Sequence, residues 1–321
     1  MLAIACPGQG SQTPGFLSPW LDLPGVRDQL EHLSDRAGLD LVRHGTVSDE
    51  ETIKDTAVAQ PLIVAAGLVT ARLLLADHVL TASTVLAGHS VGELTASAVA
   101  GALTEEDAIA FVRVRANAMA EAAAATPTGM SAVLGGDPDE VTDRLSHLGL
   151  TVANANGGGQ VVAAGTLEQL SALGEDPPAR ARVVPLKVAG AFHTHHMSPA
   201  VTALEDLRGS LTPTDPVATL ISNYDGKPVI RGDGNLDSLI AQVSRPVRWD
   251  LCMESMQHMG ITGLIELSPA GTLTGLAKRG MRGTAALAVK SPEDLEAAHA
   301  FIEEHSRTTD PDPSITAEGS Q

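Results

Sequence analysis

The sequence contains few aromatic, basic and cysteine residues. Only four Phe, two Trp and one Tyr occur in 321 residues, and 21 Lys and Arg are outnumbered by 39 Asp and Glu, which gives a net charge of -18. Nucleic-acid binding relies on basic surfaces and stacking aromatics, so the composition argues against a nucleic-acid partner. Cys6 and Cys252 form neither a metal-ligand pattern nor a disulfide framework, which fits a reducing cytoplasm.

Long hydrophobic runs are also missing. The start, Met1 to Pro7, has no basic segment followed by an apolar one, so no signal peptide is predicted. The most apolar segment, 62–76, contains Gly67 and Arg72 and is shorter than the ~20 residues of a membrane helix. We therefore expect no membrane span and a cytoplasmic protein. With 43% hydrophobic residues, the chain has enough apolar side chains for a large α/β unit or for two units of roughly 150 residues.

Apolar runs alternate with helical segments in both the first and the last third of the chain. Short buried strands are predicted in these two parts at 2–6, 84–87, 217–223 and 261–267, and a further strand is predicted at 183–188 in the middle of the chain. Helices are predicted at 58–76, 93–102, 104–125 and 198–209, with Thr104 as an N-cap. This alternation is typical of a parallel sheet covered by helices.

The middle of the chain has a different pattern. Strands are predicted at 131–134, 152–155 and 161–164, and helices at 138–148 and 166–173. We therefore predict a large α/β unit, built from 1–123 and 190–305, that is interrupted by a small β/α unit at 124–189. Residues 306–321 contain no large core residue except Ile315, and we expect a flexible tail.

Gly88-His-Ser-Val-Gly92 lies between a predicted strand and a predicted helix. A G-x-S-x-G pentapeptide in this position is typical of a nucleophile elbow, in which glycines permit a tight turn that presents the serine hydroxyl. Ser90 is therefore the candidate nucleophile. The alternative is an ordinary Gly-Ser turn.

A nucleophilic serine needs a base, and His193, His195 and His196 form the one histidine cluster. In an extended segment, alternation would place His193 and His195 on one side. Two alternatives stay open: a polar loop, and a metal-binding or scaffold function of His193–His196, although no second ligand group has matching spacing. His89 is a weaker candidate base, because adjacent residues in a sharp turn point apart.

Arg115 lies on the apolar stripe of the predicted 104–125 helix, with Phe111, Val112 and Met119. A buried guanidinium needs an anionic partner, which is either an acid of the protein or a substrate carboxylate. Near the N-terminus, Gly8-Gln-Gly-Ser-Gln12 has Thr13 where a dinucleotide-binding loop needs its third glycine. This loop is either a plain turn or a source of backbone amides for an oxyanion.

Taken together, these motifs resemble the malonyl-CoA:acyl carrier protein transacylase family of fatty acid and polyketide synthesis, and its actinobacterial members in particular. The resemblance covers the chain to about residue 300. The motifs that carry it are Pro7-Gly-Gln-Gly-Ser-Gln12, Gly88-His-Ser-Val-Gly-Glu93, Val114-Arg-Ala-Asn-Ala-Met119, Gly190-Ala-Phe-His193 and Pro246-Val-Arg-Trp249. It implies an α/β-hydrolase-like large subdomain interrupted by a small ferredoxin-like α+β subdomain.

The resemblance also implies a role for individual residues. Ser90 would be the acylated nucleophile and His193 its base, oriented by the backbone carbonyl of Gln242. Gln9 and the amide of Val91 would form the oxyanion hole. The substrate-binding residues would be Arg115, which binds the malonyl carboxylate, Phe192, which leaves no space for an α-methyl branch, His89 and Asn156.

The implied partners are malonyl-CoA and an acyl carrier protein that brings its own phosphopantetheine, with no bound cofactor and no metal. Because both proteins are acidic, docking requires a local basic patch. The candidates are Lys187, Lys278, Arg279 and Arg282. One departure from the family is Arg245, where several members have Asn. A serine thioesterase or esterase on the same elbow is the alternative enzyme.

Overall fold

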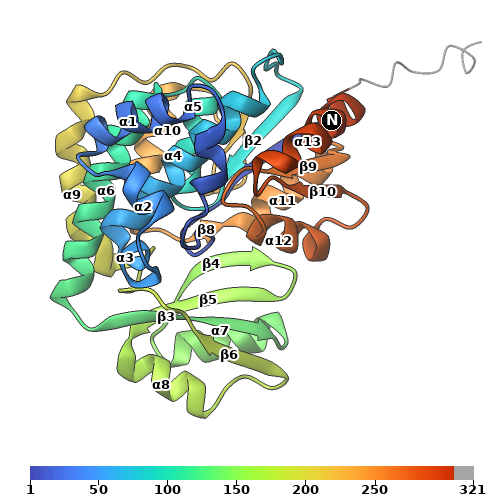
Figure 1. Cartoon of the computed structure of the whole chain (residues 1–321). Helices are drawn as coiled ribbons and strands as arrows, with labels where there is room; N and C mark the ends of the chain where they lie inside the picture. The colour runs from blue at the N-terminus through green and yellow to red at the C-terminus, as the bar shows by residue number, and fades with distance from the viewer. Residues whose placement is uncertain (307–321) are drawn as a thin grey trace, which may run out of the picture.

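The computed structural model describes residues 1–306, so nearly all of the predicted tail lies outside the described residues. Within that range the strands form two sheets surrounded by helices (Figure 1). The first sheet has five parallel strands in the order β10-β9-β1-β2-β7. They are β1 (Leu2–Cys6), β2 (Thr84–Gly88), β7 (Thr219–Ile221), β9 (Gly263–Glu266) and β10 (Ala285–Ala288). The predicted mixed α/β fold with a parallel sheet is confirmed.

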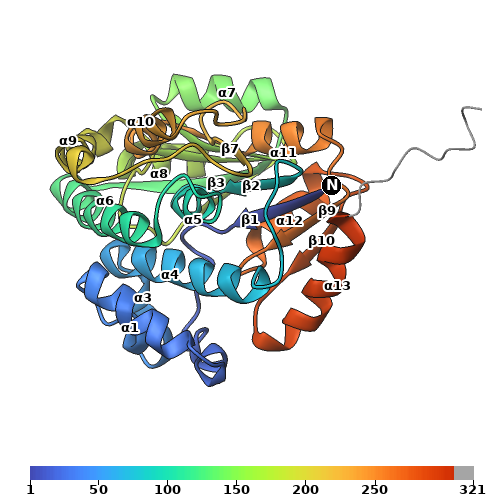
Figure 2. The same cartoon turned by 90° about the horizontal axis from the view of Figure 1, so that it is seen from above.

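Strand β1 occupies the centre of this sheet because both of its faces are apolar. Leu2, Ile4 and Cys6 enter one hydrophobic cluster, whereas Ala3 and Ala5 enter another. Helices accordingly cover both faces (Figure 2). The first cluster includes residues from α4 (Thr56–Leu74), α5 (Gly92–Val99) and α6 (Glu105–Ala125), and the second from α11 (Trp249–His258) and α12 (Thr272–Gly280).

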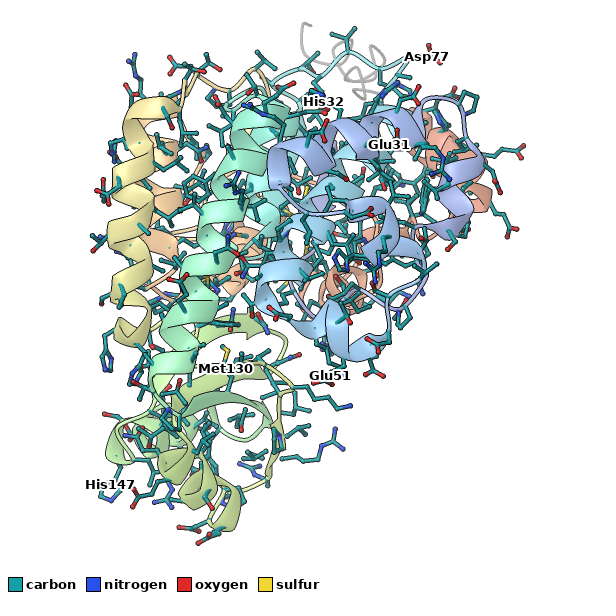
Figure 3. All side chains as sticks on the ribbon, turned by 60° about the vertical axis from the view of Figure 1, so that its left-hand side comes forward. Glu31, His32, Glu51, Asp77, Met130 and His147 are labelled. Atoms are coloured by element: carbon teal, nitrogen blue, oxygen red, sulfur yellow. The ribbon has the colours of Figure 1, made fainter. Side chains whose placement is uncertain are left out.

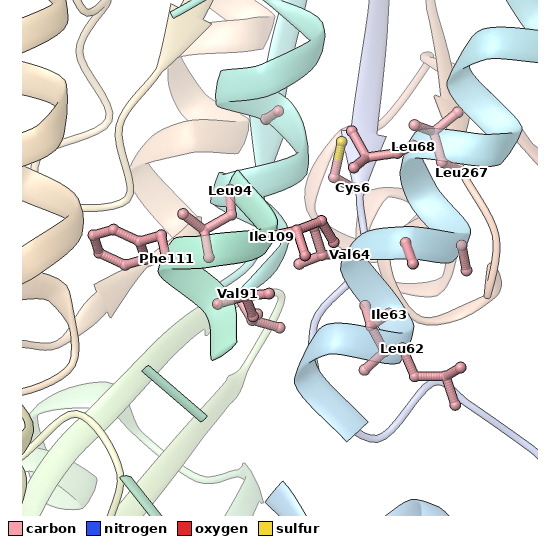
Figure 4. Packing of buried hydrophobic residues seen from close by; sticks show 14 of the residues in the cluster. Cys6, Leu62, Ile63, Val64, Leu68, Val91, Leu94, Ile109, Phe111 and Leu267 are labelled. Carbon is pink, nitrogen blue, oxygen red and sulfur yellow. The ribbon is translucent and has the colours of Figure 1, made fainter. Parts of the chain in front are cut away.

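The larger cluster fixes β1, α4, α5 and α6 against one another. Figure 4 shows Val64 of α4 beside Ile109 of α6 and Leu68 of α4 beside Cys6 of β1, with Leu94 of α5 nearby. All five side chains are buried. Close packing of this kind resists displacement, so the loops that leave these elements start from fixed points.

Helix α4 is long and apolar enough to cross a membrane by length and composition, but 78% of its most apolar window is buried inside the protein. The apolar segment 62–76 was expected to be too short to span a bilayer. That expectation was wrong about length, because the helix that contains most of it passes the length criterion. Burial gives the better reason: α4 is apolar on all sides because the protein core surrounds it.

The second sheet has the order β6-β3-β5-β4-β8 and is antiparallel except for the parallel pair β4–β8. Its strands are β3 (Thr128–Gly135), β4 (Thr151–Gly157), β5 (Gln160–Thr166), β6 (Ala181–Pro185) and β8 (Val247–Arg248). Helices α7 (Pro138–His147) and α8 (Leu167–Glu175) pack on it around a small core of its own. Strand β8 comes from outside 124–189 and joins this sheet to the rest of the chain.

Residues 13–57 had no assignment from the sequence, yet they form one short 3-10 helix and three α-helices, and α4 begins at their end. Asp40, Asp49 and Asp55 each accept a backbone N–H at a helix start, as N-cap residues do. The predicted cap Thr104 is confirmed by its bond from the Asp107 amide, 3.0 Å. The remaining helices are η1 (Ser18–Asp22), α1 (Val26–Ala37), α2 (Leu41–Thr46), α3 (Glu50–Lys54), η2 (His195–Met197), α9 (Ser198–Leu207), η3 (Arg208–Ser210), α10 (Gly232–Gln242), η4 (Pro292–Asp294) and α13 (Leu295–Ser306).

The register of the parallel sheet brings two predicted motifs together. Cys6 pairs with Gly88, so β1 and β2 end at the same level. The 7–12 loop and the 88–92 turn therefore leave adjacent strands at one edge of the sheet. Ligand sites in parallel sheets form at this carboxyl edge.

Candidate active site

The turn after β2 presents Ser90 in a left-handed conformation, with φ of 54°. Two glycines allow it. A Cβ on Gly88 would lie 2.1 Å from the carbonyl of Gly92, and a Cβ on Gly92 would lie 2.2 Å from the carbonyl oxygen of Cys6. The strand–turn–helix context expected for the pentapeptide is confirmed, and the glycines are needed because backbone packs directly on backbone.

Ser90 and His193 form a hydrogen-bonded pair. Ser90 Oγ lies 2.7 Å from His193 Nε2, and His193 Nδ1 lies 2.8 Å from the carbonyl oxygen of Gln242. A carbonyl only accepts, so Nδ1 carries the proton and Nε2 is left to accept from the serine. Gln242 thus takes the orienting position that an acid occupies in other triads.

The extended arrangement expected for His193–His196 is wrong. His193 has φ of 61°, and residues 195–197 form the short helix η2. His195 and His196 pack ring against ring at 4.1 Å. In residues 1–306, no cluster of three His, Cys, Asp or Glu side chains is arranged to hold a metal ion.

His193 is neutral at neutral pH. Burial, and then the positive charge of Arg115, lower the pKa of His193 to about 3. A neutral imidazole can take a proton from serine, whereas an imidazolium cannot. The same electrostatics that keep it neutral therefore keep it available as a base.

Arg115 is buried, with 1% of its surface exposed, and projects from α6 toward Ser90. Its guanidinium donates to Gln60 Oε1 at 2.6 Å, to Gln242 Oε1 at 2.9 Å and to Ser90 Oγ at 3.2 Å. Burial lowers its pKa to about 9, against the opposing effect of Glu93, so it stays cationic at neutral pH. Among the described residues no carboxylate lies within 4.0 Å, so the internal ion pair considered for Arg115 does not form.

Glu93 and Asn223 complete the network, and the sequence analysis missed both. Glu93 is buried and accepts the Asn223 backbone N–H at 2.7 Å and the side-chain amide of Gln242. Asn223 Oδ1 accepts the Ser90 N–H at 2.8 Å, and its amide donates to the Gly88 carbonyl. Burial raises the pKa of Glu93 to about 7.

Two signals in the sequence pointed to these residues. Glu93 is the one acid in an otherwise apolar, Ala-rich segment, where only a partnered carboxylate is tolerated. Asn223 ends a predicted strand, and the carboxyl ends of parallel strands meet at one edge. Gln60, the third missed residue, lies within the apolar helix α4 and has no comparable signal.

A cavity of about 290 Å³ opens above Ser90 between the two sheets. Its floor contains Ser90 and His193, and the 8–10 loop forms one side. Met119, Met130, Val162 and Phe192 make an apolar wall. Figure 3 shows Met130 where α6 meets the second sheet, so the cavity spans both parts of the fold.

The residues assigned to an oxyanion hole flank Ser90. Gln9 lines the cavity, and its side chain accepts from Gln60 at 3.3 Å and donates to Thr56 at 3.4 Å. Within residues 1–306, the backbone N–H groups of Gln9 and Val91 donate to no protein acceptor. Val91 follows Ser90 in the chain but is not among the residues that line the cavity. Unpaired amides are suited to a developing negative charge.

Three residues assigned to substrate binding also line the cavity. Phe192 is 6% exposed. His89 Nε2 lies 2.8 Å from Asn156 Oδ1, and the His89 ring meets the edge of Trp249. Burial lowers the pKa of His89. His89 is therefore hydrogen-bonded to Asn156 of β4, and the imidazole that accepts from the Ser90 hydroxyl is that of His193.

The basic residues proposed for docking differ in position. Arg279 lines the cavity and donates to Gln160 at 3.1 Å, whereas Lys278 and Arg282 are exposed near the end of α12. Lys187 lies 3.9 Å from Glu50, with 80% of its side chain exposed. Arg245, the departure from the family, stacks over Tyr224 at 5.2 Å from the ring centroid.

Comparison with known proteins gives one consistent family. The acyl transferase domain model matches residues 5–308. A malonyl CoA-acyl carrier protein transacylase of Mycobacterium tuberculosis is 53% identical over 297 residues, covering 92% of this chain and 98% of the relative. The counterpart from Escherichia coli is 31% identical over 303 residues, covering 92% and 98%.

Solved structures agree. The crystal structure of MCAT from M. tuberculosis aligns with a TM-score of 0.89 at 51% identity, covering 93% of this chain and 99% of that one. A malonyl-transacylase in complex with a type II polyketide synthase acyl carrier protein aligns with a TM-score of 0.87 at 30% identity, covering 93% and 99%. The chain therefore belongs to the acyl transferase family and, within it, to the malonyl CoA-acyl carrier protein transacylases.

Proposed function

We propose that this protein transfers a malonyl group from malonyl-CoA to the phosphopantetheine thiol of an acyl carrier protein, through an ester on Ser90. The observation that carries the proposal is the buried Arg115, which has no carboxylate partner among the described residues and lies 3.2 Å from Ser90 Oγ. A malonyl group esterified at Oγ ends in a carboxylate three carbons away, within reach of that guanidinium. The relatives named for this reaction support the same substrate pair.

The first half-reaction forms the ester. Ser90 Oγ attacks the thioester carbonyl while His193 Nε2 takes the hydroxyl proton. The carbonyl oxygen becomes an oxyanion that accepts from the backbone N–H groups of Gln9 and Val91. The carbon–sulfur bond then breaks, and coenzyme A leaves as a thiol with the proton from His193. The Gln242 carbonyl stabilises the transient imidazolium through Nδ1–H.

The second half-reaction follows the same path with the carrier protein as acceptor. His193 deprotonates the phosphopantetheine thiol, the thiolate attacks the ester carbonyl, and Ser90 leaves with the returned proton. The two half-reactions share one site, which is ping-pong chemistry. No step requires a bound cofactor or a metal.

Selectivity for malonyl rests on charge and on shape. Arg115 would bind the substrate carboxylate as a planar donor pair, and an acetyl group would leave this charge without its anion. The ring of Phe192 leaves little room for an α-methyl branch. His89 and Asn156, held to each other at 2.8 Å, form part of the acyl-binding wall.

We also propose how the chain is divided between the two parts of the fold. We assign 1–123 and 190–305 to an α/β-hydrolase-like unit that carries Ser90 and His193, and 124–189 to a ferredoxin-like unit that closes the cavity.

The buried, unpaired Cys6 and Cys252 fit a cytoplasmic protein.

Docking of the acidic carrier protein would use Lys187, Lys278, Arg279 and Arg282. Arg279 lines the cavity, and Lys278 precedes it on α12. Arg279 lies on the side of α12 that lines the cavity, whereas Lys278 is exposed on the outer side of the same helix. A carrier protein held at this end of α12 can direct its phosphopantetheine arm toward Ser90.

The experiment that tests the proposal compares transfer with hydrolysis. With labelled malonyl-CoA, we expect holo carrier protein to be malonylated at least about 100-fold faster than free malonate appears without it, because the site is built for a thiol acceptor. A thin-layer or chromatographic assay separates the two products. Rapid malonate release that carrier protein does not suppress would instead identify a thioesterase.

A further inference from the structure

The side chain of Gln242 lies between Arg115 and Glu93, and its partners determine its orientation. Gln242 Nε2 donates to the Ser90 carbonyl at 3.0 Å and to Glu93 Oε2, and Oε1 accepts from Arg115 at 2.9 Å. Arg115 can only donate, and Glu93 can only accept when it is ionised, which is the case above its raised pKa of about 7. The reversed amide would place donor against donor at Arg115 and acceptor against acceptor at Glu93.

Glu93 is itself fixed at both oxygens. Oε1 accepts the Asn223 backbone N–H at 2.7 Å, and Oε2 accepts from Gln242. Glu93 is 1% exposed, and no cation lies within 4.0 Å of its carboxylate in residues 1–306. Its countercharge, Arg115, is reached through the Gln242 amide. Burying a carboxylate without a cation in direct contact lowers the free energy of unfolding. Such a group points to a role other than stability.

We infer that Glu93 is a positioning residue for substrate selection: its carboxylate fixes the Gln242 amide, and Gln242 Oε1 then holds the Arg115 guanidinium where an acyl carboxylate binds. Glu93 touches neither the nucleophile's hydroxyl nor the base. This inference rests on the proposed function, because it concerns the malonyl carboxylate.

Replacing Glu93 by Gln preserves the size of the side chain at this position, but it no longer determines which way the Gln242 amide is oriented. If the new amide keeps its oxygen on the Asn223 N–H, its NH₂ group faces the NH₂ group of Gln242. Gln242 then has to turn and present a donor to Arg115, which displaces the guanidinium. The Gln242 backbone carbonyl stays on His193, so the base remains oriented.

The experiment measures kcat/KM for acylation by malonyl-CoA and by acetyl-CoA. In Glu93→Gln we expect the malonyl value to fall about 10- to 100-fold and the acetyl value to change less than about threefold, since only malonyl uses Arg115. Arg115→Met gives the reference for complete loss of the preference. A merely structural role would lower both values equally.

Glu266→Gln is the matched control. Glu266 is also a fully buried glutamate, but it accepts the backbone N–H groups of Gly271, Leu273 and Thr274 at the start of α12. We expect this variant to leave the malonyl-to-acetyl ratio unchanged, whatever it does to stability. A ratio that falls equally in Glu266→Gln would overturn the inference.

A second variant keeps the test decisive if Glu93→Gln does not fold. Gln242→Leu retains the backbone carbonyl that orients His193 but removes the amide, so we expect the same loss of preference. If folded Gln242→Leu keeps the wild-type malonyl-to-acetyl ratio while wild-type protein is acylated normally, the role of Glu93 is overturned and the proposed function stands. Wild-type protein that takes up no malonyl group would instead overturn the proposed function.

Discussion

The positive charge of Arg115 affects the protonation of His193, which is hydrogen-bonded to Ser90. The guanidinium that selects a carboxylate also lies close enough to His193 to lower its pKa, after burial. Burial and this positive charge together keep the base neutral. When an acyl carboxylate pairs with Arg115, that effect weakens and His193 becomes a better proton acceptor.

The pH dependence of Ser90 reactivity tests this coupling. A histidine with a lowered pKa stays neutral as the pH falls, and loses reactivity only when the pH passes through the folded value of about 3. Inactivation by the uncharged reagent phenylmethanesulfonyl fluoride should therefore proceed at a nearly constant rate from about pH 8 to about pH 5. A rate that halves near the ordinary histidine pKa of about 6.5 would contradict the account.

At the residue scale, the motifs and the family resemblance predicted the hydrogen-bonded group of Ser90, His193, Arg115 and Gln242, but missed three residues that surround it. Ser90 lies in a short motif, and the helical stripe marked Arg115 as buried. Glu93, Asn223 and Gln60 act through contacts across long sequence separations, such as 130 residues between Asn223 and Glu93. Such pairings follow from the register of the parallel sheet and not from local spacing.

At the element scale, the position of α5 against β1 decides whether the serine turn can form. The Gly92 backbone lies directly on the carbonyls of Cys6 and Pro7, at the end of the central strand. No side chain fits between them, so the turn packs directly on a strand that is buried at every position. This contact gives the second glycine of the pentapeptide its physical role.

We expect Gly92→Ala to destabilise the protein by about 3 kcal/mol or more, because the new methyl group meets backbone that cannot move aside. Urea denaturation followed by circular dichroism measures the change. Gly174→Ala is the control: Gly174 lies in α8, where an added Cβ would meet nothing within 4 Å, and the variant should gain about 0.5 to 1 kcal/mol. A Gly92→Ala variant as stable as the parent would refute the packing argument.

Element prediction succeeded where local patterns are strong. The apolar strand at 2–6 and the capped helix from 104 follow from their own residues. The turn at His193 did not, because its left-handed backbone is fixed by the bond from the His193 N–H to the Val243 carbonyl, 50 residues away in sequence. The short helices α2 and α3 have Asp N-caps but too few turns to show a clear period.

At the scale of the whole molecule, the negative net charge of the protein opposes the docking of an acidic carrier protein. The net charge is -18, and Figure 3 shows acidic Glu31, Glu51 and Asp77 on the outer surface. A carrier protein that is also acidic is repelled at long range, so attraction has to be local. The basic end of α12, beside the cavity, is the part of the surface we propose for it.

We expect Lys278→Glu to raise the KM for holo carrier protein about 3- to 10-fold and to leave acylation by malonyl-CoA unchanged, because only the second half-reaction involves docking. Arg27→Glu, which makes the same change of charge on α1, should leave both unchanged. Steady-state kinetics at low salt measure the effect. Equal KM values for the Lys278 and Arg27 variants would remove α12 from the docking surface.

The central claim is that Ser90 carries the malonyl group between two thiols. Intact-protein mass spectrometry tests it most directly: the protein is mixed with malonyl-CoA, and holo carrier protein is added afterwards. We predict that wild-type protein gains the mass of one malonyl group and then loses it as the carrier protein gains it, and that Ser90→Ala gains none. Malonylated carrier protein formed by Ser90→Ala at the wild-type rate would contradict the account.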